Sequence, residues 1–506
     1  MNISERYLQE IRQSFSSQQE FEDFLNSCQM PLKKSIKISL HKILPEEFKK
    51  DTEPQGWKLT DPGFINSYSL PTSWSSSDLK LPNDIYYVDR EDTSIPLWKT
   101  FYHQSGFFYI QEVAAWMPAR QLFNDSSVDE EIILDMSAAP GGKSVQIGDY
   151  LQFLNKNWKL WMVVSNDLSK QRLMAASFNL NRMGIFNSVI TNFNGFSFWK
   201  NLPEFFDKVL LDAPCSWEWT GFKSDFWLKY WRKEEINKIA STQYQLLVSA
   251  LKTVKVWGVI VFSTCTMNPY ENEFNLKKLM EEYAWAVELE EVFIEGKDPG
   301  LTKWNEEKLL SDEDSQKVAR FWPHKQKTWG FFIAKLRKTS SLLRDKNYEN
   351  KLFAKKTLNF EDNKKLQDEV KKLLKDSFWI ITDDNKHYFV WTKNYVYVTS
   401  PMFKKLKSYL SFEKIWVPIL KRNNRGQMRP THYLGVIFWD LASKNIAVVD
   451  TESAYKYGLW QDLSEGEFVL ENVDNPLMNY VILKYKNWWM WVAKLLDGRL
   501  KNKYIK

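Results

Sequence analysis

Short apolar runs alternate with amphipathic segments through the middle of this 506-residue chain. Runs that are apolar on both faces are typical of parallel strands buried between layers of helices. The alternation predicts a doubly wound α/β sheet. The predicted strands lie at residues 131–135, 160–167, 188–191, 206–212, 258–264 and 329–336, and the predicted helices at 171–183, 242–255 and 271–283.

The two ends of the chain follow other patterns. Helical spacing of apolar residues precedes a segment in which Ile36 and Ile38 alternate with polar residues, which predicts a half-buried strand. Charged residues dominate from 338 to 375, whereas the rest of the chain is aromatic and strand-rich. We predict an N-terminal region at 1–95, an α/β domain at 96–338, a charged linker and helix at 339–375, and a β-rich domain at 376–506.

The turn after the first central strand consists of small residues. Such residues let a ligand approach the backbone and the start of the next helix. A small cofactor is therefore expected at this turn, which comprises Ser137, Ala138, Ala139, Pro140, Gly141, Gly142 and Lys143.

Two later strands each deliver a cysteine just beyond their C-terminal ends. These residues are Cys215, in Asp-Ala-Pro-Cys, and Cys265, in Ser-Thr-Cys-Thr. Ligands of open α/β sheets bind outside the carboxyl ends of the strands. Both thiols are therefore expected at the cofactor edge.

Three motifs carry a resemblance to a known family. Asp-Met-Ser-Ala-Ala-Pro-Gly-Gly-Lys at 135–143, Asp-Ala-Pro-Cys at 212–215 and Ser-Thr-Cys-Thr at 263–266 resemble those of RNA (cytosine-5) methyltransferases. The plan of the chain resembles the RsmF (YebU) branch, which methylates 16S ribosomal RNA and ends in a PUA-like RNA-binding domain. The resemblance implies a Rossmann-like domain, S-adenosylmethionine (SAM) as cofactor and RNA as partner.

Two polar residues are candidates for the nucleoside part of SAM. Asp167 ends the second strand, where a carboxylate can accept hydrogen bonds from both ribose hydroxyls. The alternative is a helix N-cap. Asn194 stands where the family usually has Asp beside the adenine, and an Asn-Gly turn is its alternative.

The resemblance assigns catalysis to three residues. Cys265 is the nucleophile that adds to cytosine C6, and Cys215 assists loss of the C5 proton and collapse of the adduct. Asp212 is expected to bind the base edge as an acid with a raised pKa. The alternatives are inert buried cysteines and a capping carboxylate.

A phosphate-binding loop is a competing interpretation. Gly142-Lys143-Ser144 after a strand resembles the end of such a loop, and Asp212 could hold magnesium. That pattern requires glycine at position 137, which is Ser137, and it leaves Asp167 and both cysteines without a role.

Composition narrows the class of protein. The chain has 69 Lys and Arg against 63 Asp and Glu, so RNA binding must depend on local clusters such as Lys33, Lys34 and Lys37. A solvated strand edge is the alternative for these lysines. Three cysteines fit a reducing compartment, and the five histidines form no zinc-like spacing with them. We expect a cytoplasmic monomer without structural metal, membrane span or DNA partner.

The chain is poor in glycine and rich in tryptophan, with 18 and 24 residues. A source that reads UGA as glycine would explain both numbers, and peptide masses from that source would decide the question. A surface that stacks on RNA bases is the adaptive alternative. Tryptophan stands where the family pattern has glycine at Trp98, Trp217, Trp219, Trp257, Trp329, Trp489 and Trp491.

Two other functions stay open. One is methylation of transfer RNA. The other is a catalytically silent RNA-binding factor in ribosome assembly.

Overall fold

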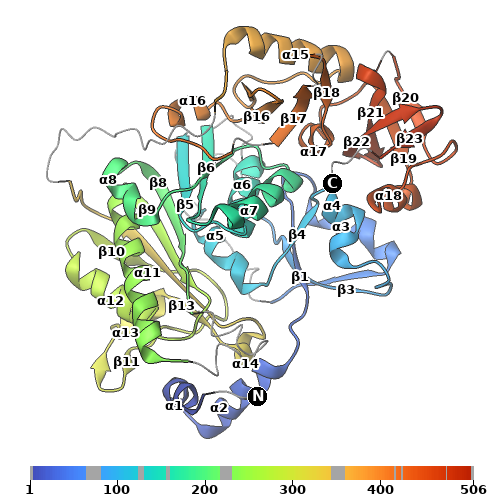
Figure 1. The fold of residues 1–506 in the computed structure, drawn as a ribbon. Coiled ribbons are helices and arrows are strands. Elements are labelled where there is room, and N and C mark those ends of the chain that lie inside the picture. The colour runs from blue at the N-terminus through green and yellow to red at the C-terminus, as the bar shows by residue number, and fades with distance from the viewer. Residues whose placement is uncertain are drawn as a thin grey trace.

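The computed structural model describes residues 4–63, 81–123, 130–154, 160–216, 231–343, 359–414, 417–422, 426–474 and 476–502. Figure 1 shows a central α/β part, an N-terminal part beside it and a C-terminal β-rich part above it. Within these ranges, no helix combines the length and the apolar character that a membrane crossing requires.

The central sheet confirms the predicted doubly wound fold. Its strands are β5 (Glu130–Asp135), β6 (Leu160–Asn166), β7 (Ser188–Thr191), β8 (Phe206–Asp212), β9 (Val254–Thr264), β10 (Val287–Glu290), β13 (Ala319–Phe321) and β14 (Phe331–Lys338). The order is β10-β14-β9-β8-β5-β6-β7, with β13 paired to β14. Strands β5 to β9 are parallel. The order in which strands are added reverses at β5, since β6 and β7 lie on one side of it and β8 and β9 lie on the other. Ligands of such sheets bind at this switch point.

Helices cover both faces of this sheet. Alternate residues of β5 explain why: Ile132 and Leu134 belong to one buried cluster and Ile133 to the other. The first cluster includes α8 (Phe198–Asn201), α11 (Lys233–Thr253) and α12 (Glu273–Glu282), and the second includes α5 (Met117–Gln121), α6 (Gly142–Leu154) and α7 (Lys170–Met183). Helix α11 begins before the predicted residue 242 and ends at Thr253, because Val254 already pairs with β8.

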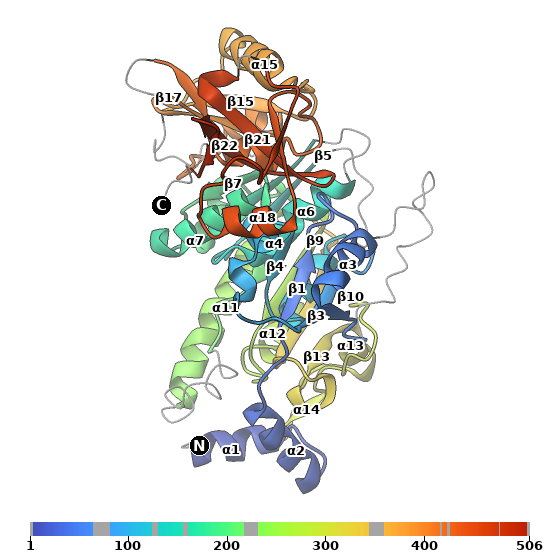
Figure 2. The same ribbon diagram turned by 90° about the vertical axis from the view of Figure 1, so that its right-hand side faces the viewer.

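The N-terminal part consists of a small sheet and short helices (Figure 2). The sheet order is β2-β3-β1-β4. Ahead of the sheet, helices α1 and α2 pack against the α/β part, where the Phe15 and Trp322 ring centroids lie 5.2 Å apart. The elements are α1 (Glu5–Arg12), α2 (Gln18–Gln29), β1 (Ser35–Ile38), α3 (Pro45–Thr52), β2 (Trp57–Thr60), β3 (Ile85–Arg90), α4 (Phe101–Gln104) and β4 (Phe108–Ile110).

Strand β1 is buried on both faces, which corrects the predicted half-buried strand. Lys37 is fully buried, with its Nζ 3.1 Å from Asp84 Oδ2 and ion-paired with Asp149 of α6. The alternating pattern indicated a face in water, but α6 covers that face. Of the three lysines expected to contact phosphates, only Lys33 and Lys34 are exposed.

The C-terminal part contains two sheets and rests on both other parts. The Phe205 and Tyr409 ring centroids lie 5.2 Å apart, and those of Phe101 and Tyr485 lie 5.0 Å apart. The first sheet contains β15 (Tyr388–Trp391), β16 (Tyr395–Thr399), β17 (Val417–Arg422) and β18 (Met428–Pro430). The second contains β19 (Ile446–Val449), β20 (Val469–Glu471), β21 (Tyr480–Tyr485), β22 (Trp488–Leu496) and β23 (Arg499–Lys501).

Shorter elements complete the described chain. The linker helix α15 (Lys364–Phe378) confirms the predicted helical stretch at 362–375. The others are β11 (Lys303–Trp304), β12 (Glu307–Lys308), α13 (Asp312–Lys317), α14 (Pro323–Gln326), α16 (Phe403–Leu406), α17 (Tyr433–Ile437) and α18 (Thr451–Gly458).

Three tryptophans have backbone conformations that favour glycine. Trp257, Trp379 and Trp460 have φ of 67°, 57° and 70°, a region that a bulky side chain rarely adopts. Their side chains are 65, 54 and 46 % exposed, so burial of the indole offsets little of the strain. These values support glycine at 257, and they add positions 379 and 460 to those that the family pattern indicates.

The other tryptophans do not all follow this pattern. Trp491 is buried, and its ring centroid lies 5.4 Å from that of Tyr457, so an indole fits there. Trp98 is exposed. Trp217 and Trp219 lie outside the described residues, as does the side chain of Trp489.

Replacing Trp257 with glycine is expected to stabilise the protein by about 1 kcal/mol, because an L side chain is strained in the left-handed region. Trp285 is the matched control, since it is 61 % exposed and is not among the residues with positive φ. Trp285→Gly is expected to destabilise, because glycine loses more backbone entropy on folding. Urea denaturation curves compare the two variants, and a loss of stability in Trp257→Gly contradicts the prediction.

Candidate active site

A cavity of about 430 Å³ opens at the carboxyl ends of β5, β6, β8 and β9. This position is the switch point of the sheet. Ligand sites typically measure about 300–1,000 Å³, so the cavity suits a nucleoside-sized ligand. Six of the predicted site residues line it, namely Ser137, Ala139, Asp167, Asn194, Asp212 and Cys265.

The glycines of the turn serve packing within the protein. A Cβ on Gly141 would lie 2.8 Å from Ala176 Cα of α7, and the φ of Gly141 is 102°. A Cβ on Gly142 would lie 2.2 Å from Gln111 Oε1. Neither residue lines the cavity, and neither do Ala138, Pro140 and Lys143. The sequence predicted that a ligand approaches this backbone closely, but the groups that approach Gly141 and Gly142 are α7 and Gln111.

Asp167 is a buried carboxylate at the cavity wall. Its Oδ2 accepts from the Ala139 N–H at 3.2 Å and its Oδ1 from the Ser169 N–H at 2.9 Å. Ser169 is the N-cap of α7, where it accepts from the Arg172 N–H, so the alternative of Asp167 as the N-cap is wrong. Each carboxylate oxygen can accept a second hydrogen bond, which suits a pair of ligand hydroxyls.

Asn194 lines the cavity and also shapes its own loop. Its Oδ1 accepts from the Phe196 N–H at 3.0 Å. The turn that was the alternative to an adenine contact is thus present. Its hydrogen bond involves the Asn194 oxygen and not the amide NH₂ group.

Several lining residues were not candidates in the sequence, among them Leu168, Arg172 and Phe196. Leu168 is 72 % exposed although it is apolar, and Phe196 is half-buried. Arg172 donates to the Ala139 carbonyl at 2.6 Å and so fixes the turn. An apolar residue directly after a strand-ending acid could have indicated Leu168, but Phe196 and Arg172 reach the cavity only through the fold.

Asp212 is engaged from two sides. Lys143 Nζ lies 2.7 Å from its Oδ2, and Ser263 Oγ donates to its Oδ1 at 2.7 Å. Lys143 therefore points from the turn toward Asp212 at the end of β8. The next residue, Ser144, donates to Oδ2 of Asp135 at the end of β5, at 2.6 Å. Burial raises the pKa of Asp135 to about 7.

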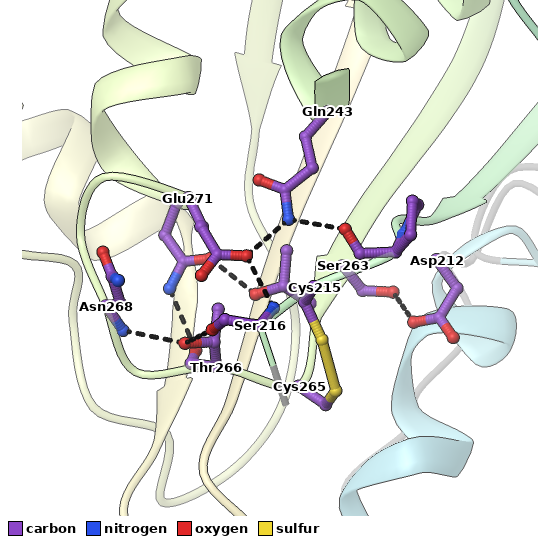
Figure 3. Close-up of a disulfide and its surroundings, with 12 residues drawn as sticks. Asp212, Cys215, Ser216, Gln243, Ser263, Cys265, Thr266, Asn268 and Glu271 are labelled. Carbon is purple, nitrogen blue, oxygen red and sulfur yellow. Dashed lines mark hydrogen bonds between the residues drawn. A yellow bond between two sulfur atoms is a disulfide. The ribbon is translucent and has the colours of Figure 1, made fainter. Parts of the chain in front are cut away.

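Cys215 and Cys265 meet at the rim, as expected for adjacent strands β8 and β9. Figure 3 shows their sulfur atoms joined in a disulfide, and the Cα atoms lie 6.4 Å apart. The cysteine count pointed to free thiols, so the bond corrects that expectation. The physical reason is the parallel pairing of β8 and β9, which brings together residues that are 50 positions apart.

Two buried residues hold the loops that carry the cysteines. Gln243 of α11 donates to the Pro214 carbonyl at 2.9 Å and to Glu271 Oε2 at 2.7 Å. The same Glu271 oxygen accepts from the Ser216 N–H at 3.0 Å, and Ser216 Oγ lies 3.4 Å from Thr266 Oγ1 (Figure 3). Glu271 and Gln243 together therefore anchor the backbone on both sides of Cys215.

Replacing Glu271 with alanine is expected to lower kcat about 100-fold, since small displacements of reacting groups have costs of that size. Glu271→Gln keeps an acceptor oxygen and should retain most of the rate. SAM affinity should be unchanged in both variants, because neither Glu271 nor Gln243 lines the cavity. Single-turnover methylation and calorimetry separate the two effects. A parallel loss of SAM binding contradicts a positioning role.

The donor set of the cavity fits the nucleoside of SAM. Asp167 offers acceptors for hydroxyls, and Leu168 and Phe196 offer apolar surface for a base. The described residues contain no group of three His, Cys, Asp or Glu side chains suited to a metal ion.

Comparison with known proteins shows the family to which the chain belongs. The family described as "16S rRNA methyltransferase RsmB/F" matches residues 125–337. Ribosomal RNA small subunit methyltransferase F of Vibrio campbellii (strain ATCC BAA-1116) is 30% identical over 506 residues, which cover 99% of this chain and 96% of that protein. The protein of that name from Escherichia coli (strain SMS-3-5 / SECEC) is 35% identical over 340 residues, 66% of this chain and 63% of that protein.

Solved structures share the fold. A methyltransferase homolog protein from Pyrococcus horikoshii is similar at a TM-score of 0.51, with 25% identity over 66% of this chain and 100% of that chain. NSun6 from Pyrococcus horikoshii with SFG is similar at a TM-score of 0.50, with 23% identity over 66% of this chain and 98% of that chain.

Proposed function

Because this chain belongs to the RsmB/F family of 16S rRNA methyltransferases, we propose that it methylates C5 of a cytosine in small-subunit ribosomal RNA. It is a SAM-dependent RNA (cytosine-5) methyltransferase, and SAM supplies an electrophilic methyl group when bound. The observation that carries the proposal is the meeting of Cys215, Cys265 and Asp212 beside a nucleoside-sized cavity.

Cys265 is the proposed nucleophile. Cytosine C5 attacks a methyl group poorly until a thiolate adds at C6, which forms a C–S bond and shifts electron density to C5 and N3. Only the reduced form can react in this way, because the disulfide withholds both sulfurs. Cys265 lines the cavity, so the adduct would form beside the methyl donor.

Asp212 and Cys215 have the supporting roles. The Asp212 carboxyl would hydrogen-bond N3 or N4 of the base, and the Lys143 ammonium at 2.7 Å would offset the negative charge that addition creates. After methyl transfer, Cys215 would assist removal of the C5 proton. The electrons of that C–H bond restore the ring double bond as the C6–S bond breaks and Cys265 leaves as thiolate.

The cofactor is proposed to lie along β5 and β6. Asp167 would accept hydrogen bonds from the ribose hydroxyls, and the backbone at Ser137 and Ala139 would face the amino-acid end. Asn194 would donate to the adenine through its NH₂ group. The NH₂ group is the part of the amide that the hydrogen bond from the Phe196 N–H does not involve.

The target base must leave its stack to reach this rim. The protein is proposed to act as a cytoplasmic monomer without a membrane or DNA partner, and to bind RNA through the terminal parts of the chain.

Incubating reduced protein and SAM with unmodified ribosomal and transfer RNA tests the function by mass spectrometry of 5-methylcytidine. A product in small-subunit RNA is expected, a product in transfer RNA alone favours the runner-up, and no product favours a silent binding factor.

A further inference from the structure

A second cavity lies in the C-terminal part, where its two sheets meet. Its volume is about 240 Å³. Strands β16, β17 and β18 supply one wall, and Tyr480 and Val492 of the other sheet supply the opposite wall. The volume is below the usual range for drug-sized ligands, so it suits a single base.

Two cations line this cavity and oppose each other directly. Lys421 of β17 pairs in register with Arg429 of β18. Like charges at paired positions destabilise a sheet. Neither side chain has an ion-pair partner among the described residues, and none of the described residues that line the cavity is acidic. The pair is half-buried and can therefore bind an anion that enters the cavity.

Aromatic rings stand beside the cations. Tyr395 and Tyr433 are half-buried and line the cavity, and Lys421 Nζ lies 5.4 Å from the Tyr395 ring centroid. Burial lowers the pKa of His432 to about 3, so its imidazole is neutral and adds no third positive charge to the cavity. Stacking rings and two cations together match a nucleotide.

The cavity is separate from the active site. Helix α17, which begins at Tyr433, lies next to the C-terminal end of α7, where a Cβ on Gly184 would lie 3.3 Å from Val436. The catalytic cavity touches Ser169 and Arg172 at the other end of α7. A helix of 14 residues is about 21 Å long, so the two cavities cannot hold the same nucleotide.

We propose that this cavity binds one unpaired nucleotide of the substrate RNA away from the target cytosine. Lys421 and Arg429 hold its phosphate, and Tyr395 or Tyr433 stacks on its base. The proposal rests on the proposed function for its choice of RNA over a free nucleotide. It gives the C-terminal part a defined contact with single-stranded RNA.

Binding of a short labelled single-stranded RNA to the reduced full-length protein tests this site without turnover. Lys421→Ala with Arg429→Ala is expected to weaken binding about 30-fold at low salt. It should also reduce the salt slope of log K by about 0.7, because one phosphate contact on a single strand is lost and each such contact contributes about 0.7. Tyr395→Leu should weaken binding about 10-fold and leave the salt slope unchanged.

Lys372→Ala with Lys375→Ala is the matched control, because it removes the same charge from exposed positions of α15. An equal loss of affinity in this control overturns the proposal, as does an unchanged salt slope in the first double variant. AMP should bind more weakly than the RNA, and an AMP affinity equal to or above that of the RNA would assign the cavity to a free nucleotide. SAM binding should stay unchanged in all variants. Absence of 5-methylcytidine would refute the proposed function but leave these affinities interpretable.

Discussion

Cys265→Ala is expected to lower methyl transfer by at least about 1,000-fold, because it removes the proposed nucleophile while the SAM cavity keeps its other walls. SAM affinity should change little, since Cys265 is one of many residues that line the cavity. Radiolabelled methyl transfer to unmodified ribosomal RNA, with reductant present, measures the rate. The reductant matters because the disulfide leaves no thiolate at position 265.

Cys28→Ala provides the matched control for this variant. Cys28 is buried in α2 among apolar residues, and burial raises the pKa of its thiol, so it has neither the exposure nor the thiolate that a nucleophile needs. Its replacement should leave the methylation rate within a few-fold of the parent, as expected for a residue outside the cavity. Full activity in Cys265→Ala would eliminate the covalent mechanism proposed for this chain.

Cys215→Ala is expected to accumulate a covalent adduct between RNA and protein. Methyl transfer can still occur in this variant, but the step that expels Cys265 loses its proposed assistant. The adduct should appear as a slow-migrating band on a denaturing gel that disappears on RNase treatment. Turnover should fall by at least about 100-fold, the usual size of a lost acid–base contribution.

The double variant with Cys215→Ala and Cys265→Ala separates trapping from simple binding. It should form no adduct, because the attacking sulfur is gone. An adduct in the double variant would assign the attack to another residue, and normal turnover in Cys215→Ala would remove Cys215 from the release step. Ser216→Ala tests the neighbouring position, and its backbone contact with Glu271 should persist.

Local pattern was enough to predict six strands of the central sheet, but it did not predict β10 and β13. Each of the six reads as a short apolar run, since both faces are buried under helices and local sequence therefore records their environment. The acid of Asp167, the small residues at 137–142 and both cysteines follow such strands, and parallel pairing brings strand ends to one edge. The position of the candidate site could therefore be predicted from the sequence.

Contacts between distant parts of the chain could not be predicted from the local sequence. Lys37 was expected in solvent, but α6 covers it and Asp149 pairs with it 112 positions away. The register of β8 and β9 decided that Cys215 and Cys265 touch, and packing against α7 and Gln111 decided why positions 141 and 142 are glycine. The apposition of Lys421 with Arg429 likewise required the pairing of β17 with β18. The sequence alone determined the parallel strands of the sheet, their cofactor edge and the residues able to do chemistry, because these depend on local periodicity and motif. The tertiary structure alone decided which side chains meet, because such meetings depend on register and packing between distant segments.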